Sequence, residues 1–414
     1  MKLLYDLGIL LYSFGAWIVS FFDEKAKKFV EGRKNVFDLL SEKMDPNAQY
    51  VWIHAASLGE FEQGRPIIEK LRITNPEYKI LLTFFSPSGY EVRKNYEGAD
   101  VVCYLPMDTS WNVKRFLSIV HPSYAIFIKY EFWMNYLSYL KKNGIPTYIV
   151  SAIFRKSQAF FQWYGRWYCN ILKNFTHLFV QNQESKDLLA SVGIQNVSLA
   201  GDTRFDRVAD IAAKSKQLPI IESFVGDAKV FIAGSSWPKD EDILIPYINE
   251  HPDIKFIIAP HEIHSEHIDS ITAKLKRPYV LYTTTNEEEA KSAECIIINC
   301  FGLLSSIYRY GQVAYIGGGF GVGIHNILEA SVYGIPVLFG PNYHKFKEAV
   351  DMIERGGAYS ISNATEFAKL MDDFYDSSSV LYEKTAQMAA IYSQENRGAT
   401  EKIVKKIFGE STSV

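Results

Sequence analysis

The sequence has few cysteines and no paired cysteine motif. Its 414 residues include four cysteines, scattered along the chain without a C-x-x-C pair. This pattern is typical of a reducing compartment and argues against a disulfide framework or a zinc ribbon. The chain also lacks a basic excess, because its formal net charge is −3. No global positive field is available to hold nucleic acid, so any anion-binding site is expected to be local.

Several catalytic signatures are missing as well. The chain has no G-x-x-x-x-G-K-[ST] loop, no G-x-S-x-G elbow and no protein-kinase signature set. Its glycine-rich segment does not complete a dinucleotide fingerprint. A G-x-G-x-x-G frame from Gly317 places Val322 at the third glycine, and a frame from Gly319 places Ile324 there. An NAD-dependent oxidoreductase is therefore the least favoured class.

A histidine cluster does not complete a metal motif. His261, His264 and His267 lie close together, but Ser265 stands where H-E-x-x-H requires its second histidine. Two histidines at i and i+3 are a weak ligand pattern by themselves. We therefore expect no metal and no other cofactor.

One long apolar run opens the chain. Residues 3–22 carry Asp6 as their only charge and have about the length that crosses the hydrocarbon core of a bilayer. Five basic residues follow: Lys25, Lys27, Lys28, Arg33 and Lys34. They favour a cytoplasmic flank in contact with anionic lipid. We expect membrane anchoring or interfacial docking, with a buried amphipathic helix as the alternative. Whether the run spans the bilayer or lies flat stays open.

From about residue 47, short β-branched or aromatic runs alternate with amphipathic helical patterns. This alternation predicts parallel sheets covered by helices on both faces. Seven such strands precede a strandless connection at 206–227, and seven follow it. The predicted order is an apolar segment and basic flank at 1–34, a first domain at 35–210, a linker at 211–228, a second domain at 229–390, and a C-terminal helix at 391–414 that packs back on the first domain.

Two glutamates follow predicted strands of the first domain. Glu60 is spaced from Ser57 as in an S-x-x-E capping box, which is its simplest interpretation. At a strand-to-helix turn beside Gly59, the same carboxylate is also placed to act as a general base on a hydroxyl. Glu131 follows the strand "IFIK", where its simplest role is to complement a helix dipole. Two acids at two strand ends of one sheet predict a shared site.

The second domain offers a phosphate site. Five of the seven residues from Gly317 to Gly323 are glycine. A helix predicted to start near His325 and Asn326 would receive phosphate at its free amides, and Glu329 in its first turn would accept ribose hydroxyls. A capped helix is the simpler alternative.

Two further side chains are placed for a nucleotide. His261 follows the strand "KFIIAP" and is expected to face the nucleotide, whereas Arg204 follows the last strand of the first domain and offers a fixed positive fork suited to phosphate. An interdomain salt bridge is the alternative for Arg204. Because strand carboxyl ends of doubly wound domains open toward ligands, we expect the chemistry in a cleft between the domains.

Taken together, these segments resemble one family over nearly the whole chain. The motifs are "HAASLGE", "KYEFWMN", "GDTRFD", "APHE", "FGLLSSIYRYGQVAYIGGG" and "HNILEA…GIPVLFGPNYHKFKEA". They are similar to the bacterial 3-deoxy-D-manno-octulosonic acid (Kdo) transferases of lipopolysaccharide assembly. The resemblance implies an α/β GT-B fold, with two Rossmann-like doubly wound domains facing an interdomain cleft and an N-terminal hydrophobic membrane-anchoring helix.

The resemblance also implies a reaction. It is the inverting transfer of Kdo from CMP-Kdo to a lipid A precursor (lipid IVA), without a bound cofactor or metal, on the cytoplasmic face of the inner membrane. Membrane lipid is then a partner and nucleic acid is not. In this reading the first domain binds the acceptor and the second binds the CMP-sugar.

Site residues carry over from the family one at a time. Glu60 takes the place of its general base, Glu131 that of a second essential acid, and Arg204 that of a lysine. Pro260 and His261 stand where the family has "PR" near the CMP phosphate, so an arginine has become histidine. The remaining donor-binding positions are Phe301, Gly302 and Leu303 at the cytidine, and Asn326, Ile327, Leu328 and Glu329 at the family's "NPLE". Secondary candidates are Ser57, Gly59 and His325.

Two other functions remain open from the residues themselves. One is a GT-B transferase or epimerase that uses a UDP-sugar. The other is a non-catalytic, membrane-bound sugar-binding protein, although the presence of Glu60, Glu131 and Glu329 together favours catalysis.

Overall fold

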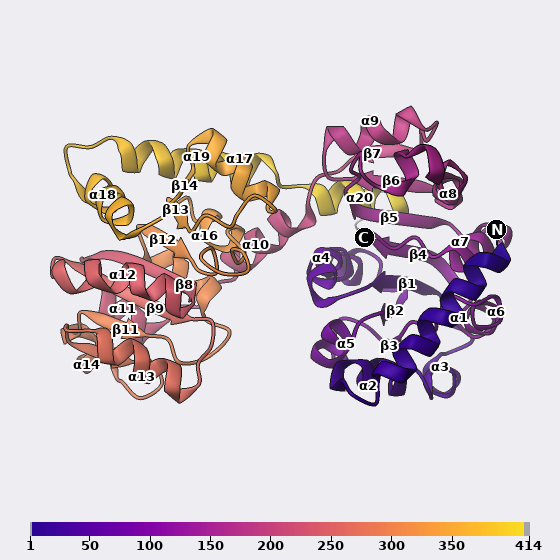
Figure 1. Ribbon diagram of the computed structural model, residues 1–414, viewed down its shortest axis with the longest axis horizontal. Coiled ribbons are helices and arrows are strands. Elements are labelled where there is room, and N and C mark those ends of the chain that lie inside the picture. The colour runs from indigo at the N-terminus through magenta and orange to yellow at the C-terminus, as the bar shows by residue number, and fades with distance from the viewer. Residues whose placement is uncertain (1, 410–414) are drawn as a thin grey trace. The chain divides into compact units, whose positions relative to one another are not determined.

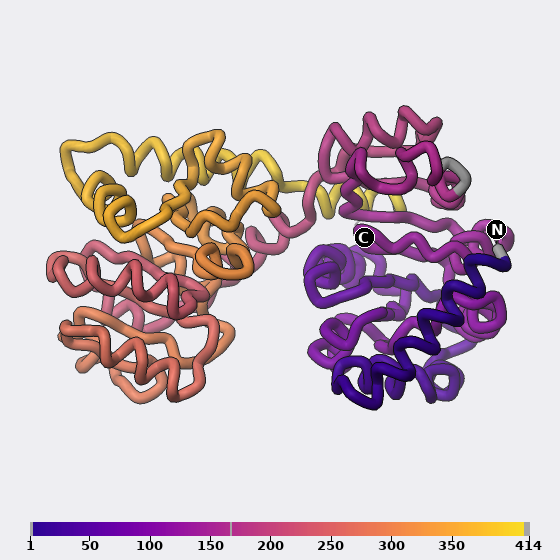
Figure 2. Tube along the Cα trace, viewed as in Figure 1, coloured from indigo at the N-terminus to yellow at the C-terminus, as the bar shows by residue number. Residues whose placement is uncertain are grey.

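The computed structural model describes residues 2–409, which form two compact units (Figure 1). Unit 1 takes the described residues up to Arg207 and from Arg397 onward, and unit 2 is Val208–Asn396. The tube in Figure 2 shows the chain leaving unit 1, building unit 2 and returning. The boundary falls inside a helix, α10 (Thr203–Ala213), and a second helix, α11 (Pro219–Val225), lies within the expected linker.

Unit 1 contains a seven-stranded parallel sheet in the order β3-β2-β1-β4-β5-β6-β7. Its strands are apolar along nearly their whole length because helices cover both faces. The strands coincide with the seven predicted runs. They are β1 (Tyr50–Ala55), β2 (Lys79–Phe84), β3 (Val101–Tyr104), β4 (Pro122–Ile128), β5 (Thr147–Ala152), β6 (His177–Val180) and β7 (Val197–Leu199).

The helices of unit 1 enclose two apolar cores, one on each face of the sheet. The C-terminal helix α20 (Ala399–Phe408) packs beside α4 (Leu58–Thr74) and adds Ile403, Val404 and Ile407 to one core. The other helices are α1 (Lys2–Val19), α2 (Glu24–Glu31), α3 (Val36–Lys43), α5 (Pro87–Arg93), α6 (Ser110–Val120), α7 (Met134–Lys142), α8 (Arg166–Cys169) and α9 (Gln183–Ser191), with short 3₁₀ turns at Ala159–Phe161, Trp163–Gly165 and Asn170–Asn174.

Unit 2 repeats the architecture with the order β10-β11-β9-β8-β12-β13-β14. Its strands, which also match the predicted runs, are β8 (Lys229–Ser236), β9 (Ile254–Pro260), β10 (Tyr279–Leu281), β11 (Cys295–Ile297), β12 (Val313–Ile316), β13 (Val337–Phe339) and β14 (Ala358–Ser360). Its helices after α11 are α12 (Pro238–Glu250), α13 (Ser265–Lys274), α14 (Glu287–Ser292), α15 (Leu304–Ile307), α16 (Leu328–Ser331), α17 (Lys347–Arg355), α18 (Ala364–Tyr375) and α19 (Leu381–Glu395), with a 3₁₀ turn at Tyr308–Tyr310.

Each sheet has one point where the winding reverses. In unit 1 it lies between β1 and β4, and in unit 2 between β8 and β12. The loops that leave such neighbouring strands run to opposite faces of the sheet, so they leave a crevice at the carboxyl ends. The residues after these four strands are therefore the first place to look for a site.

Helix α1 is held to unit 1 by polar bonds along one side. The Tyr5 hydroxyl donates to Asp108 Oδ2 at 2.7 Å, and Asn135 Nδ2 donates to Asp6 Oδ1 at 2.6 Å. Its other side exposes large apolar residues, among them Leu7 and Leu11. Among residues 2–409, no helix has both the length and the apolar character needed to cross a bilayer. The predicted separate segment 1–34 is thus an arrangement of helices within unit 1.

Candidate functional site

Glu60 stands at the third position of α4, just beyond the end of β1. Its Oε2 accepts a hydrogen bond from the Ala56 amide at 2.7 Å, while the hydroxyl of the N-cap residue Ser57 makes no capping bond. Only half of the predicted capping box is therefore present. Burial, helped by the charge of Glu131, raises the pKa of Glu60 to about 7. A carboxyl group that titrates near neutral pH is suited to general-base work.

Glu131 lies in the loop between β4 and α7, three residues before the helix begins at Met134. It was expected to open that helix. Its Oε2 instead faces two ring nitrogens, His54 Nε2 at 2.9 Å and Trp133 Nε1 at 2.6 Å. The side chain is nearly buried, with 7% of the residue exposed. Glu131 therefore belongs to a buried polar cluster beside Glu60 rather than to a helix dipole.

The backbone between β4 and Glu131 is strained. Lys129 adopts a left-handed conformation with φ of 68°, which a non-glycine residue adopts only at some energetic cost. Its charge lies near Glu60 and works against the rise in the pKa of that carboxyl. The turn thus places a cation, Lys129, and an anion, Glu131, near the carboxylate of Glu60.

Arg204 is anchored by its neighbour in unit 1. Its Nε and Nη2 donate to Asp202 Oδ2 at 2.9 and 2.7 Å, and its side chain is 27% exposed. The pair fixes the guanidinium plane and leaves part of the group accessible. A fixed planar cation of this kind suits phosphate or carboxylate.

The reversal point of unit 2 has a different chemistry. Trp237, directly after β8, stacks on His261 with ring centroids 4.6 Å apart, and His261 stacks on His325 at 4.4 Å. The indole N–H of Trp237 donates to His325 Nε2 at 2.9 Å, which requires an unprotonated nitrogen there. Burial lowers the pKa of His325, so this ring is neutral at pH 7. The exposed ring of His261 stacks on both of these rings, so the three side chains form one aromatic and imidazole stack.

The glycine loop beside this stack is tightly packed. A Cβ at Gly317 would collide with the Ser235 carbonyl oxygen, so the loop needs glycine to approach the end of β8. The helix predicted near His325 begins only at Leu328 and ends at Ser331. Within the turn before it, Asn326 accepts from the Leu328 amide at 3.2 Å and donates to Glu329 Oε1 at 3.1 Å.

The residues predicted to bind the nucleotide differ in how exposed their side chains are. Ile327 and Leu328 are fully buried, and Pro260 is buried too, so their side chains build the core instead of presenting a surface. The exposed positions are Phe301, with 74% of the residue accessible, and Gly302, with φ of 89°. Leu303, Asn326 and Glu329 are half-buried.

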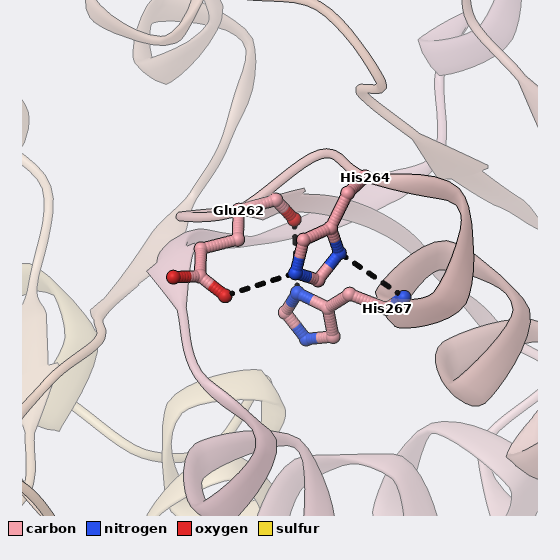
Figure 3. Close-up of side chains that lie close together, drawn as sticks. All are labelled: Glu262, His264 and His267. Carbon is pink, nitrogen blue, oxygen red and sulfur yellow. Dashed lines mark hydrogen bonds and ion pairs between the residues drawn. The ribbon is translucent and has the colours of Figure 1, made fainter.

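Among the described residues, Glu262, His264 and His267 form the group whose ligand atoms come closest to a metal arrangement (Figure 3). However, both ring nitrogens of His267 are already bonded. Nδ1 lies 2.9 Å from the Glu262 carbonyl oxygen, and Nε2 lies 3.0 Å from both oxygens of the buried Glu241. Two acceptors on one ring indicate an imidazolium, which has no lone pair for a cation. His267 is therefore engaged by Glu241 and by the Glu262 backbone, while His264 Nε2 lies 3.2 Å from Glu262 Oε2.

Comparison with known proteins shows a similarity to one family. The family model described as 3-Deoxy-D-manno-octulosonic-acid transferase (kdotransferase) matches residues 29–207. A 3-deoxy-D-manno-octulosonic acid transferase of Aquifex aeolicus is 29% identical over 324 residues, covering 76% of this chain and 83% of that protein. One of Rickettsia prowazekii is 24% identical over 386 residues, covering 91% and 83%. The chain is thus similar to Kdo transferases, and these matches indicate a glycosyltransferase.

A solved structure extends the comparison to the fold. UDP-GlcNAc 2-epimerase from Neisseria meningitidis aligns with a TM-score of 0.61 and 16% identity, over 87% of this chain and 100% of that one. This likeness shows the GT-B-like pair of Rossmann-like sheets. The match to the Kdo transferase family model ends at Arg207, where unit 1 also ends before α20 returns.

Sequence reasoning missed four side chains of these sites: His54, Thr83, Trp133 and Trp237. His54 and Thr83 are fully buried polar residues in the otherwise apolar strands β1 and β2. A polar residue inside a run such as "YVWIHA" was the available signal, because a buried polar group needs a partner. The two tryptophans gave no such signal, since an aromatic residue after a strand most often packs in a core.

Proposed function

We propose that this glycosyltransferase moves Kdo from CMP-Kdo to a hydroxyl of a lipid A precursor, with inversion, in lipopolysaccharide biosynthesis. The family match supports the reaction class. The observation that carries the assignment is Glu60, a carboxyl group at the β1/β4 reversal point whose pKa of about 7 suits it to accept a proton. The donor CMP-Kdo is proposed for unit 2, and the lipid acceptor for unit 1.

The proposed step balances without a cofactor. Glu60 takes the proton of a glucosamine hydroxyl as its oxygen attacks the anomeric carbon of Kdo. The bond from that carbon to the phosphate oxygen breaks on the opposite side, and CMP leaves with the electron pair. Negative charge grows on the phosphate, where His261 of unit 2 is proposed to meet it. A polar group that is already held in place lowers the barrier because it needs no reorganisation.

An apolar cavity supports a lipid acceptor. It has a volume of about 560 Å³ and lies among α1, α2 and the loop after β2, with Tyr12, Val19, Phe29 and Phe85 in its wall. The Phe85 ring also lies 4.8 Å from the ring of Trp133, which bonds Glu131. An acyl chain in this cavity would therefore lie near Glu60 and Glu131, which are called the acidic pair below. The sugar of the same lipid must react at these residues.

The surface of α1 supports docking on the membrane interface. Its outward residues Leu3, Leu7, Leu11 and Phe14 are each more than half exposed, which is unusual for a contiguous apolar surface in water. Lys25, Lys27, Lys28 and Lys34 are exposed nearby. We propose that α1 lies in the interface on the cytoplasmic face of the inner membrane, with these lysines toward anionic lipid.

Arg33, counted in the predicted basic cluster, has another role. Its guanidinium donates to the carbonyl oxygens of Leu105 at 2.9 Å, Phe29 at 2.8 Å and Phe85 at 2.6 Å. It also lies over the Phe29 ring at 3.8 Å. Burial lowers the pKa of Arg33 to about 10. It fastens α2 to unit 1, so the lipid-facing charge comes from the lysines.

Glu60→Gln tests the proposed base. Transfer from CMP-Kdo to a tetra-acylated lipid A precursor should fall by about 10²-fold or more, since a positioned general base contributes roughly that much. Glu62→Gln on the same helix is the matched control and should keep near-normal turnover. CMP, but not UDP, should protect all three proteins against thermal unfolding. Near-normal transfer by a folded Glu60→Gln variant would refute the assignment.

Flotation with anionic vesicles tests the interface. Leu7→Glu with Leu11→Glu should move the protein out of the vesicle fraction, because two charges enter the exposed apolar side of α1. Ile73→Glu is the control, since Ile73 is 76% exposed elsewhere on unit 1. Equal flotation of all variants would exclude α1 as the docking surface.

A further inference from the structure

A line of hydrogen bonds crosses the sheet of unit 1 behind the acidic pair. It begins at Trp52, whose Nε1 donates to Thr83 Oγ1 at 2.8 Å. Thr83 Oγ1 lies 2.9 Å from His54 Nδ1, and His54 Nε2 lies 2.9 Å from Glu131 Oε2. Trp52, His54 and Thr83 are all fully buried. Because these three side chains are buried, each polar group depends on its neighbours for a partner, and the proton positions are coupled.

The contacts of the Thr83 hydroxyl favour one tautomer of His54. The indole N–H of Trp52 occupies one lone pair of the Thr83 hydroxyl, which leaves that hydroxyl its own proton to donate. The acceptor in reach is His54 Nδ1. The imidazole proton then sits on Nε2 and points at Glu131. With Trp133 as second donor, Glu131 Oε2 accepts two N–H groups and needs no proton of its own.

The competing arrangement has the opposite effect on Glu131. The Thr83 carbonyl oxygen also lies 3.1 Å from His54 Nδ1 and would accept an N–H from it. If Nδ1 carried the only proton, the Nε2 lone pair would face Glu131 and require a protonated carboxyl group. If both nitrogens were protonated, an imidazolium would cancel the carboxylate charge. Only the Thr83 hydroxyl proton favours a neutral ring beside an anion.

We propose that His54, oriented by Thr83 and Trp52, is a positioning residue that holds Glu131 as an uncancelled anion beside Glu60. The charge of Glu131 then keeps a proton on Glu60 until neutral pH, so that the base is tuned to the working range. This inference rests on the proposed role of Glu60. His54 itself acts only through Glu131.

Other charged groups act on the same pair and must stay constant in any test. Lys129 and Tyr130, from the turn after β4, lie near Glu60. Arg155 lies near Tyr130, and Tyr168 lies near Glu131. Thr83 bonds Trp52 and His54, so a change at Thr83 acts on the line of bonds and keeps these four side chains unchanged.

Thr83→Val removes the hydroxyl and keeps the shape of the side chain. The His54 ring then has only the carbonyl oxygen at Nδ1, and the charge at Glu131 is lost or cancelled. Glu60 should therefore titrate about 0.5–1 pH unit lower, because a like charge beside it has gone. Thr83→Ser keeps the hydroxyl and is the matched control, with no expected shift.

The titration is best followed on the full chain by ¹³C NMR of carboxyl-labelled glutamate, with the Glu60 signal assigned by its loss in Glu60→Gln. In parallel, the acid limb of kcat/KM for transfer should move to lower pH in Thr83→Val by the same amount. His54→Leu should behave like Thr83→Val. His54→Gln retains an N–H donor toward Glu131 and should restore the wild-type titration.

The outcomes separate the two proposals. An unchanged Glu60 titration in folded Thr83→Val and His54→Leu overturns the positioning role, even if their rates fall equally at every pH. Normal transfer by Glu60→Gln overturns the base, and the NMR titration then still decides the role of His54. If Thr83→Val does not fold, His54→Gln against His54→Leu supplies the same test.

Discussion

Both sheets are parallel, have seven strands and reverse their winding beside their first strand, yet these two reversal points carry different chemistry. Between β1 and β4 the loops bring together carboxylates, Glu60 and Glu131. Between β8 and β12 they bring together an indole, two imidazoles and a glycine loop around Trp237. The comparison teaches that topology decides where a site lies, while the first residues beyond the strands decide whether it moves a proton or holds an anion.

The two points also differ in the pKa of their titratable groups. Burial raises the pKa of Glu60 to about 7, so it becomes a base as pH rises through that value. Burial lowers the pKa of His325, so this ring stays neutral. The predictions below test this contrast, beginning with the one of largest expected effect.

Packing requires a glycine at Gly317, beside the β8/β12 reversal point, but not at Gly59, beside the β1/β4 reversal point. Gly317→Ala should destabilise unit 2 by about 3 kcal/mol, because the new methyl group meets the backbone at Ser235. Gly59→Ala has open space and sits in a helix, so unit 1 should be unchanged or about 0.5–1 kcal/mol more stable. Denaturant unfolding of both variants checks the difference. Equal destabilisation would remove the contrast.

Glu60→Gln should stabilise unit 1 in a pH-dependent way. The folded pKa of Glu60 lies above that of a free glutamate, so the wild-type protein loses stability as pH rises from about 4.5 to 7. Glutamine does not ionise, so the variant does not lose stability in this pH range. The variant should gain about 1–2 kcal/mol in unfolding free energy at pH 8, after allowing for solvent screening, and much less at pH 5. A gain that is the same at both pH values would contradict the burial of an ionised group.

His261→Arg should tighten CMP binding. Arginine is always charged and offers a planar fork of donors, so CMP affinity should rise about three- to tenfold relative to wild type at pH 8. Calorimetric titration with CMP measures the ratio. An unchanged affinity would mean that His261 does not meet the phosphate.

Arg204→Lys should have the smallest effect. Lysine keeps the charge beside Asp202 but loses the fork that gives two bonds to one oxygen. We expect kcat/KM for transfer to fall by about threefold, and more for Arg204→Met. Lysine and methionine variants with equal activity would exclude a charged role for this position.

All fourteen strands could be predicted from sequence, because buried parallel strands read as short apolar runs between turn residues. The placement of Glu60 followed from the same pattern. The line from Trp52 to Glu131 could not be predicted, since it joins β1, β2 and the loop after β4, whose neighbourhood exists only in the folded sheet. The helix expected near His325 begins later because the turn containing Asn326 satisfies its own amides.

Asp206 accepts from the amides of Gly398 and Thr400 at 2.6 and 2.7 Å, fastening the returning chain just before α20. Because α20 supplies part of a core of unit 1, that core stays incomplete until α20 has been synthesised, which happens only after the whole of unit 2. Glu60 and Glu131 thus belong to a unit that is completed after unit 2, and a chain truncated just before α20 should lack a stable proton acceptor even though both glutamates are present.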